Sequence, residues 1–156
     1  MADKQVEKLS QGANLMAIAG LAFIAYGVVF FALNFLSTGF ELGVETINGV
    51  TREQLNQINP AIVYYIGHLH IAAAGFIAAT GIAVYALSRY GVSEGLFWAW
   101  VAAVIAPVVG LAAALPMHYF GFFAHDWVLH LGPIYVATAV FVIGALISLK
   151  GFAKMG

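Results

Sequence analysis

The chain has 156 residues, which is enough for one domain, and its composition is far from that of a soluble protein. Hydrophobic residues make up 63% of it and charged residues only 8%, and its mean hydropathy is +0.94. This composition predicts an integral membrane protein. A net charge of −1 with six Lys and Arg residues leaves no basic patch, so we exclude nucleic acid as a partner. The absence of cysteine excludes disulfides, thiolate metal sites and cysteine nucleophiles.

Four apolar runs predict a bundle of four membrane-spanning helices, an all-α fold forming a single membrane domain, 1–156. The expected spans are about 13–36, 61–87, 96–117 and 127–149. The first run is longer than a signal-peptide core and is not followed by an A-x-A-like cleavage site, so we interpret it as a span. Residues 1–12 are expected to form a short polar or interfacial helix before the membrane. Gly20 and Gly27 lie seven residues apart and would let a neighbouring helix approach closely.

One sizeable polar connection, residues 37–60, separates the first two spans. An Asn-Gly pair at 48–49 is a turn signal. Thr51 and Gln54 have the spacing of a capping box, which predicts a short helix over about 52–58. We expect this helix to lie on the membrane surface.

Candidate caps mark the starts of the later spans. Asn59 suits the N-cap of the second helix and Pro60 its first position. Ser93 is the candidate cap of the third span and Asp126 that of the fourth. Pro107 predicts a kink within the third span.

The basic residues predict the orientation of the chain in the membrane. Those at the end of the bundle that carries both termini are Lys4, Lys8, Arg89, Lys150 and Lys154, and only Arg52 falls at the other end. Basic residues favour the cytoplasmic side. We therefore expect a multi-pass protein of the cell membrane with both termini in the cytoplasm (N-in/C-in) and the short helix on the extracytoplasmic surface.

All five histidines fall in the half of the bundle opposite the termini. Because about 20 residues cross the hydrocarbon core, counting from the cytoplasmic ends puts His68, His118 and His130 in one outer layer. Ionisable residues inside spanning helices are rare and usually functional. Since neutral imidazole is the commonest metal ligand, this layer predicts a metal or haem site. The alternative is that each histidine is an interfacial residue bonded to backbone or water.

The two histidines of the second span cannot both face the bundle axis. His68 and His70 are two residues apart, which separates them by roughly 200° around a helix. Ala72, Gly75 and Ala79 continue the His68 face as a small-residue stripe that would admit a neighbour or a flat cofactor. We therefore expect His68 to point inward, and His70 to face another helix, the surface helix or a second subunit.

Two chemistries suit these histidines. A bis-imidazole pair from facing helices holds haem b, and His68 with His130 is the pair predicted by depth. Three or more histidines closing on one ion would bind copper or, less readily, zinc, with His70, His118 and His125 as the further candidate ligands. Haem b or copper is thus the expected cofactor.

Residues 67–89 carry a motif with two histidines near the start of a helix: Gly67-His68-Leu69-His70, then Gly75, Gly81 and Tyr85 ahead of Ser88-Arg89. This segment resembles the His-x-His helix of proteins related to haem-copper oxidase and nitric oxide reductase large subunits, including small four-helix relatives. The resemblance implies that His68 and His70 hold haem, or the copper or iron beside it. The chain has four expected spans where the large subunits have twelve, and it lacks their six ligands.

The sequence as a whole predicts a membrane protein that holds haem or a metal ion in its outer leaflet and serves electron transfer or the assembly of a respiratory complex. The alternative is a non-catalytic accessory subunit, or a protein that binds a small molecule or lipid, with interfacial structural histidines. A transporter is a third class, but charged residues are lacking near the midplane. The expected partners are the lipid bilayer and either another membrane protein or further copies of this chain in a homo-oligomer.

Overall fold

The computed structural model describes residues 2–153. Its helices are α1 (Ala2–Leu36), α2 (Arg52–Ile58), α3 (Pro60–Leu87), α4 (Phe97–Tyr119) and α5 (Gly132–Phe152). There are also two π-helical turns. The first, η1 (Ser88–Val92), directly follows α3, and the second, η2 (Trp127–Leu131), directly precedes α5. Two short antiparallel strands, β1 (Thr46–Ile47) and β2 (Val50–Thr51), form a hairpin before α2.

Within residues 2–153, four helical segments are long and apolar enough to cross a membrane. They are Lys4–Leu36, Pro60–Val92, Phe97–Tyr119 and Trp127–Phe152. These segments contain the four predicted apolar runs almost entirely and extend most of them.

The separate short helix predicted for residues 1–12 is wrong over its described part, because α1 is one continuous helix from Ala2. Packing against α5 explains this continuity. Leu9 is buried, and a Cβ atom on Gly12 would lie 2.5 Å from the backbone nitrogen of Ser148. Tertiary contact thus holds the first turns of α1 in the same helix as the apolar run.

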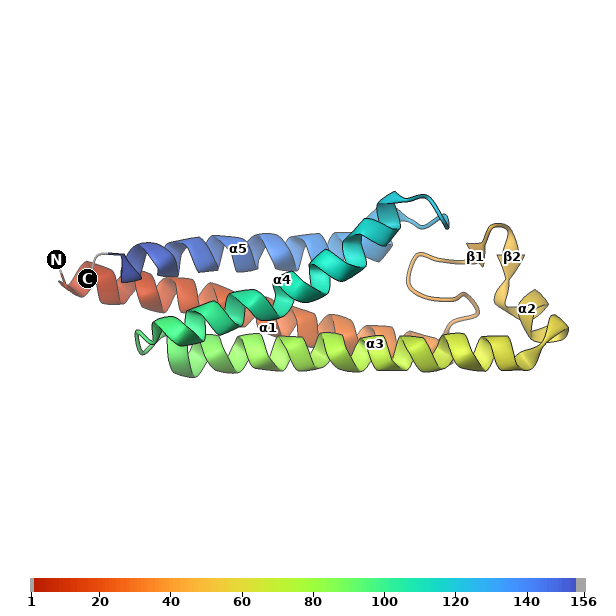
Figure 1. The fold of residues 1–156 in the computed structure, drawn as a ribbon, viewed down its shortest axis with the longest axis horizontal. Coiled ribbons are helices and arrows are strands. Elements are labelled where there is room, and N and C mark those ends of the chain that lie inside the picture. Colours follow the sequence, from red (N-terminus) through yellow and green to blue (C-terminus); the bar gives the residue numbers. More distant parts are fainter. Residues whose placement is uncertain (1, 154–156) are drawn as a thin grey trace.

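The long helices form an elongated bundle with two distinct ends (Figure 1). The terminal end carries both ends of the chain and the turn between α3 and α4, and the loop end carries 37–59 and 120–126. α1 packs along both α3 and α5. α4 crosses obliquely from the terminal end of α3 to the start of α5 (Figure 1). It therefore contacts α3 and α5 much less than α1 does.

Small residues bring α1 and α3 into close contact. Gly20 of α1 lies against Gly81, and a Cβ atom on Gly27 would lie 2.9 Å from the backbone nitrogen of Ala78. The prediction that these two glycines admit a neighbouring helix is therefore confirmed, and that neighbour is α3.

The same contact decides which face of α3 points inward. Gly67, Ala74 and Gly81 are buried and lie seven residues apart on one face. Gly75 is exposed, with nothing within 4 Å of an added Cβ atom. The predicted inner stripe through Gly75 is therefore wrong, since the helix is rotated to place the 67–74–81 face against α1.

The short helix α2 is confirmed together with its cap. The Thr51 side chain accepts a hydrogen bond from the Gln54 backbone nitrogen at 3.2 Å, and Gln54 Oε1 accepts one from the Thr51 nitrogen at 2.8 Å. The predicted turn at 48–49 joins β1 to β2, and both of its residues have positive φ. These are local features, and local sequence signals predict them correctly.

Two of the three predicted caps of the long helices are confirmed. Asn59 Oδ1 accepts from the Ala61 nitrogen at 3.0 Å, and Asp126 Oδ1 accepts from two backbone nitrogens at the start of η2. Ser93 does not cap α4, because η1 continues the preceding helix and the Ser93 hydroxyl donates to the Arg89 carbonyl at 2.6 Å. α4 begins instead at Phe97, after Leu96.

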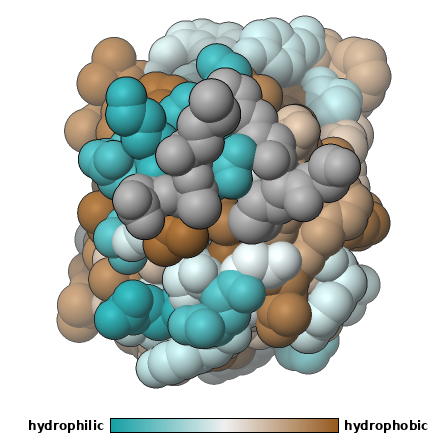
Figure 2. All heavy atoms as spheres, turned by 90° about the vertical axis from the view of Figure 1, so that its left-hand side faces the viewer, coloured by the Kyte–Doolittle hydropathy of each residue, from teal (hydrophilic) through white to brown (hydrophobic). Residues whose placement is uncertain are grey.

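Polar and apolar surfaces are separated along the bundle. Hydrophilic residues gather on the terminal end, while much of the flanking surface is hydrophobic (Figure 2). Four of the predicted basic residues belong to the segments at this end: Lys4, Lys8, Arg89 and Lys150. Lys154 lies outside the described residues. Large apolar side chains are exposed on all four long helices, among them Phe31, Phe76, Ile105 and Val136.

Candidate functional site

Two histidines from different helices face each other at the loop end. His118 Nε2 and His130 Nε2 lie 2.9 Å apart. His118 belongs to the last turn of α4, and His130 lies in η2 and is only 3% exposed. The Asp126 cap begins η2, and a π-helical turn often marks a functional position because it changes the direction of side chains.

The second nitrogen of each ring is already engaged by a backbone carbonyl. His118 Nδ1 lies 3.1 Å from the Ala114 oxygen, and His130 Nδ1 lies 2.7 Å from the Leu42 oxygen. A carbonyl only accepts hydrogen bonds, so both rings must carry a proton on Nδ1. In neutral rings both Nε2 atoms would then present lone pairs to each other. The arrangement therefore calls for an additional proton or a shared cation between them.

The connection 37–51 and Tyr26 of α1 hold His130 in place. The Asp126 nitrogen donates to the Gly43 carbonyl at 2.8 Å, and the Tyr26 hydroxyl donates to the His130 carbonyl at 3.1 Å. Gly43 has a φ of 75° and lies so close to His130 that an added Cβ atom would be 3.1 Å from the His130 Cβ. Glycine is the residue that tolerates both this conformation and this approach.

His125 is the third imidazole of this cluster. Its ring centroid lies 5.3 Å from that of His118 and 5.3 Å from that of His130, and 4.4 Å from the Trp127 ring. Within residues 2–153 both of its ring nitrogens are buried without a hydrogen-bond partner. No three His, Asp or Glu side chains in this range are arranged to hold a metal ion. The two nitrogens that converge are therefore Nε2 of His118 and Nε2 of His130. His125 would have to change its rotamer to join them.

His68 does not point into the bundle as predicted, whereas His70 faces another helix, which is one of the predicted alternatives. His68 is exposed, and its ring lies beside that of Tyr65, with centroids 6.5 Å apart. The prediction that His68 points into the bundle is wrong, because Gly67 occupies the face toward α1 and the next residue is turned by about 100°. His70, three residues after Gly67, is on the inner side and contacts Phe30 of α1.

The predicted haem pair is not brought together. His130 Nε2 is directed at His118 rather than at His68, and His68 is on the outside of α3. Of the five candidate ligands, the structure gathers His118, His125 and His130. His70 lies in a separate polar pair, with its Nε2 3.8 Å from Glu41 Oε2.

Glu41 is a polar residue of this region that was not among the predicted site residues. It lies in the connection 37–51, where neither spacing nor periodicity distinguishes it from the other acidic residues. Burial raises the pKa of its carboxyl from 4.5 to about 7. The seven-residue spacing of the small residues Gly67, Ala74 and Gly81 is the sequence signal that could have predicted which face of α3 packs against α1. His70 lies on that side of the helix, where it faces Glu41.

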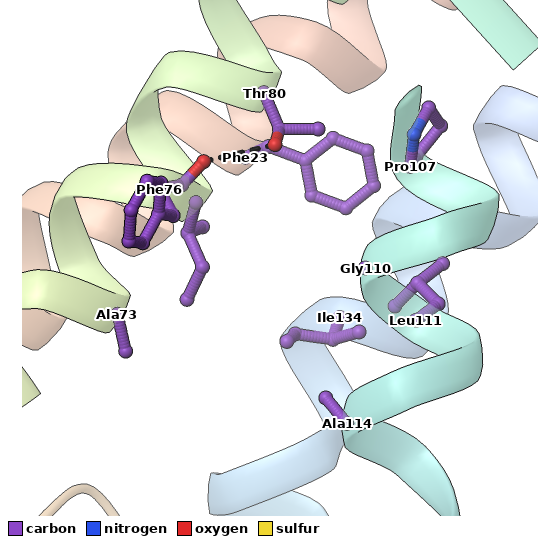
Figure 3. Close-up of a pocket in the computed structure, with 10 residues that line it drawn as sticks. Phe23, Ala73, Phe76, Thr80, Pro107, Gly110, Leu111, Ala114 and Ile134 are labelled. Atoms are coloured by element: carbon purple, nitrogen blue, oxygen red, sulfur yellow. Dashed lines mark hydrogen bonds between the residues drawn. The ribbon is translucent and has the colours of Figure 1, made fainter. Parts of the chain in front are cut away.

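A cavity separate from the histidine cluster lies nearer the middle of the bundle, between α3 and α4 (Figure 3). It has a volume of about 270 Å³, and the residues around it include Phe23, Phe76, Thr80, Pro107, Leu111 and Ile134. The hydroxyl of Thr80, the polar member, donates to the Phe76 carbonyl at 2.8 Å (Figure 3). The cavity thus offers an apolar surface without convergent polar groups.

The chain matches no family model, no curated protein and no solved structure. The resemblance of residues 67–89 to haem-copper oxidase and nitric oxide reductase subunits therefore stays a prediction. The function follows most directly from the geometry of the loop end.

Proposed function

We propose that this chain is an integral membrane protein that binds one copper or zinc ion through His118 and His130. The single observation that carries the proposal is their Nε2–Nε2 distance of 2.9 Å, with both Nδ1 atoms on backbone carbonyls. Metal-binding histidines usually donate their other ring N–H to a carbonyl or carboxylate, which fixes the ring and its tautomer.

The distance between the two nitrogens supports bent coordination of one ion. Metal–nitrogen bonds of about 2.0–2.1 Å at a tetrahedral angle place two ligand nitrogens about 3.3 Å apart. The two Nε2 atoms, which are 2.9 Å apart, need to move apart only slightly for both to bind one ion in this way. The two axial ligands of a haem lie on opposite sides of the iron, about 4 Å apart and with a porphyrin between them. The His118–His130 pair therefore supports copper or zinc better than haem.

The third ligand in this proposal is His125. Its two unpartnered nitrogens lose hydrogen bonds to water without gaining others, which costs free energy unless a ligand satisfies one of them. Rotation toward the pair would supply a three-imidazole site with an open position. Nitrogen ligands of this kind suit both zinc and copper. With copper, the site would serve electron transfer or the assembly of a respiratory complex.

Insertion in a membrane is supported by helix length and surface composition. α3 has 28 residues, about 42 Å, which exceeds the hydrocarbon thickness of about 30 Å. The exposed apolar side chains on the flanks of the bundle would face lipid. The basic residues of the terminal end favour the cytoplasmic side, so the histidines and α2 would lie on the extracytoplasmic side of the cell membrane.

Metal analysis of purified protein tests this proposal. Protein loaded separately with Cu(I) and Zn²⁺ and then dialysed is expected to retain about one ion per chain, as measured by mass spectrometry of the elements. His118→Ala and His130→Ala should each abolish retention. His68→Ala is the matched control, because His68 is exposed and outside the cluster, and it should retain the metal. Wild-type protein that retains no metal, or equal loss in all three variants, would overturn the proposal.

A further inference from the structure

A second polar site lies beside the histidine cluster, in a pocket between the connection 37–51, the first half of α3 and residues 122–123. Its volume is about 200 Å³. The residues around it are Phe40, Glu41, Val44, Ile47, Ile66, His70, Phe122 and Phe123. Apart from Glu41 and His70, all of these side chains are apolar.

Glu41 and His70 present their polar atoms to each other across a gap. Oε2 of Glu41 and Nε2 of His70 are 3.8 Å apart, which is farther than a hydrogen bond. Within residues 2–153 neither side chain makes a hydrogen bond to another residue. An oxygen placed about 2.7 Å from the carboxyl and about 2.9 Å from the imidazole would bond to both. A hydroxyl group suits this position because it donates and accepts at the same time.

The rest of the pocket favours an aromatic body attached to that hydroxyl. A water molecule occupies about 30 Å³ and needs two to four polar partners, so Glu41 and His70 can satisfy only one or two waters in a pocket of about 200 Å³. Three phenyl rings surround the remaining space, those of Phe40, Phe122 and Phe123. Aromatic rings pack well against one another in offset or edge-to-face contact.

We propose that this pocket binds a phenol-type ligand, an aromatic ring whose hydroxyl bridges Glu41 and His70. The aromatic ring of the ligand packs against the phenylalanine side chains. Its hydroxyl donates a hydrogen bond to the Glu41 carboxylate and accepts one from the His70 imidazole. This site is separate from the proposed metal site, although the ring of Phe123 contacts both His118 and His125.

Three fluorinated probes distinguish this ligand chemistry from simple apolar binding. 4-Fluorophenol donates and accepts, 4-fluoroanisole only accepts, and 4-fluorotoluene does neither. Their binding to the full chain in detergent is followed by ¹⁹F NMR at pH 8, where most Glu41 is ionised. 4-Fluorophenol is expected to bind about tenfold more tightly than the other two, because a hydrogen bond to a charged group contributes that much. Equal binding of 4-fluorotoluene would overturn the proposal.

Matched variants locate the binding. Glu41→Gln and His70→Leu should each weaken 4-fluorophenol binding by about tenfold and leave 4-fluorotoluene unchanged. Glu45→Gln and His68→Leu are the controls, since both residues are exposed and close in sequence to the tested ones. Circular dichroism checks the folding of each variant, and the two tested variants provide independent routes to the same result.

The remaining outcomes are also decisive. Unchanged 4-fluorophenol binding in both Glu41→Gln and His70→Leu would place the ligand elsewhere and overturn the proposal. Tighter binding of 4-fluorobenzylamine than of 4-fluorophenol would assign the pocket to an organic cation instead. Because Glu41 and His70 are outside the His118–His130 pair, metal retention should be unchanged in both variants. The two proposals can therefore fail separately.

Discussion

A Cβ atom added to Gly81 of α3 would lie 2.6 Å from the Gly20 carbonyl oxygen of α1. The two backbones are therefore in direct contact where these helices cross, with no space for a side chain. Nearer the loop end Gly67 also faces α1, where its missing side chain leaves room for the side chain of Asn34. This packing sets the rotation of α3 and, with it, the inward position of His70.

Gly81→Ala is expected to destabilise the protein by about 1–3 kcal/mol, because the added methyl group must push the α1 backbone away. The measurement is the unfolding midpoint in a mixed-detergent titration. Gly75→Ala is the control on the same helix, since its Cβ atom meets nothing within 4 Å. Equal destabilisation by the two changes would contradict this account of the α1–α3 contact.

His125→Ala should weaken zinc binding by about tenfold to a hundredfold without abolishing it, because the two-nitrogen pair remains. Competition with a chelator of known affinity gives the change in Kd, and His68→Ala provides the unchanged reference. A complete loss of binding, as expected for His118→Ala, would make His125 an equal partner. No change at all would remove His125 from the site.

Glu41 should make the protein less stable as pH rises from about 4.5 to about 7. Burial raises the pKa of its carboxyl in the folded protein to about 7, above the ordinary value of 4.5. In this interval the folded state keeps a proton that the unfolded state has released, so stability is greatest below the interval and is lost as pH rises through it. The loss is up to about 3 kcal/mol.

Unfolding midpoints from pH 4 to pH 8 test this dependence. Subtracting the stability profile of Glu41→Gln from that of the wild type gives the contribution of Glu41 alone. The contribution of the facing His70 cancels, because His70 is present in both proteins. The difference should grow with pH and level off above about 7. Glu45→Gln, a change at an exposed residue, should leave the wild-type profile as it is. A difference that shrinks as pH rises would mean that the buried carboxyl is stabilised as the anion.

Single cysteines test the proposed topology, because the chain contains none of its own. Asn56→Cys on α2 and Glu94→Cys in the turn before α4 both replace exposed residues. A membrane-impermeant maleimide added to intact cells should label the first and reach the second only after permeabilisation. The reverse pattern would place the histidine cluster on the cytoplasmic side.

Most features that depend on residues close together in the chain were predicted correctly. Four apolar runs predicted the four long helices, because their length and hydrophobicity are properties of each segment alone. The Thr51 capping box, the Asn59 cap and the Asp126 cap follow from contacts over two or three residues. Depth counting also correctly grouped His118 with His130, because the last turn of α4 and the turn before α5 both lie at the loop end of the bundle.

The rotation of the helices and the position of the loops depend on contacts between distant segments and could not be predicted. The choice between His68 and His70 depends on which face of α3 meets α1, and a helix of 28 residues offers several faces of similar hydrophobicity. The bond from His130 Nδ1 to Leu42 joins residues 88 apart in the chain. Glu41 becomes a partly buried neighbour of His70 through the same loop packing. Such contacts arise from the summed packing of distant segments, which no local pattern of residues encodes.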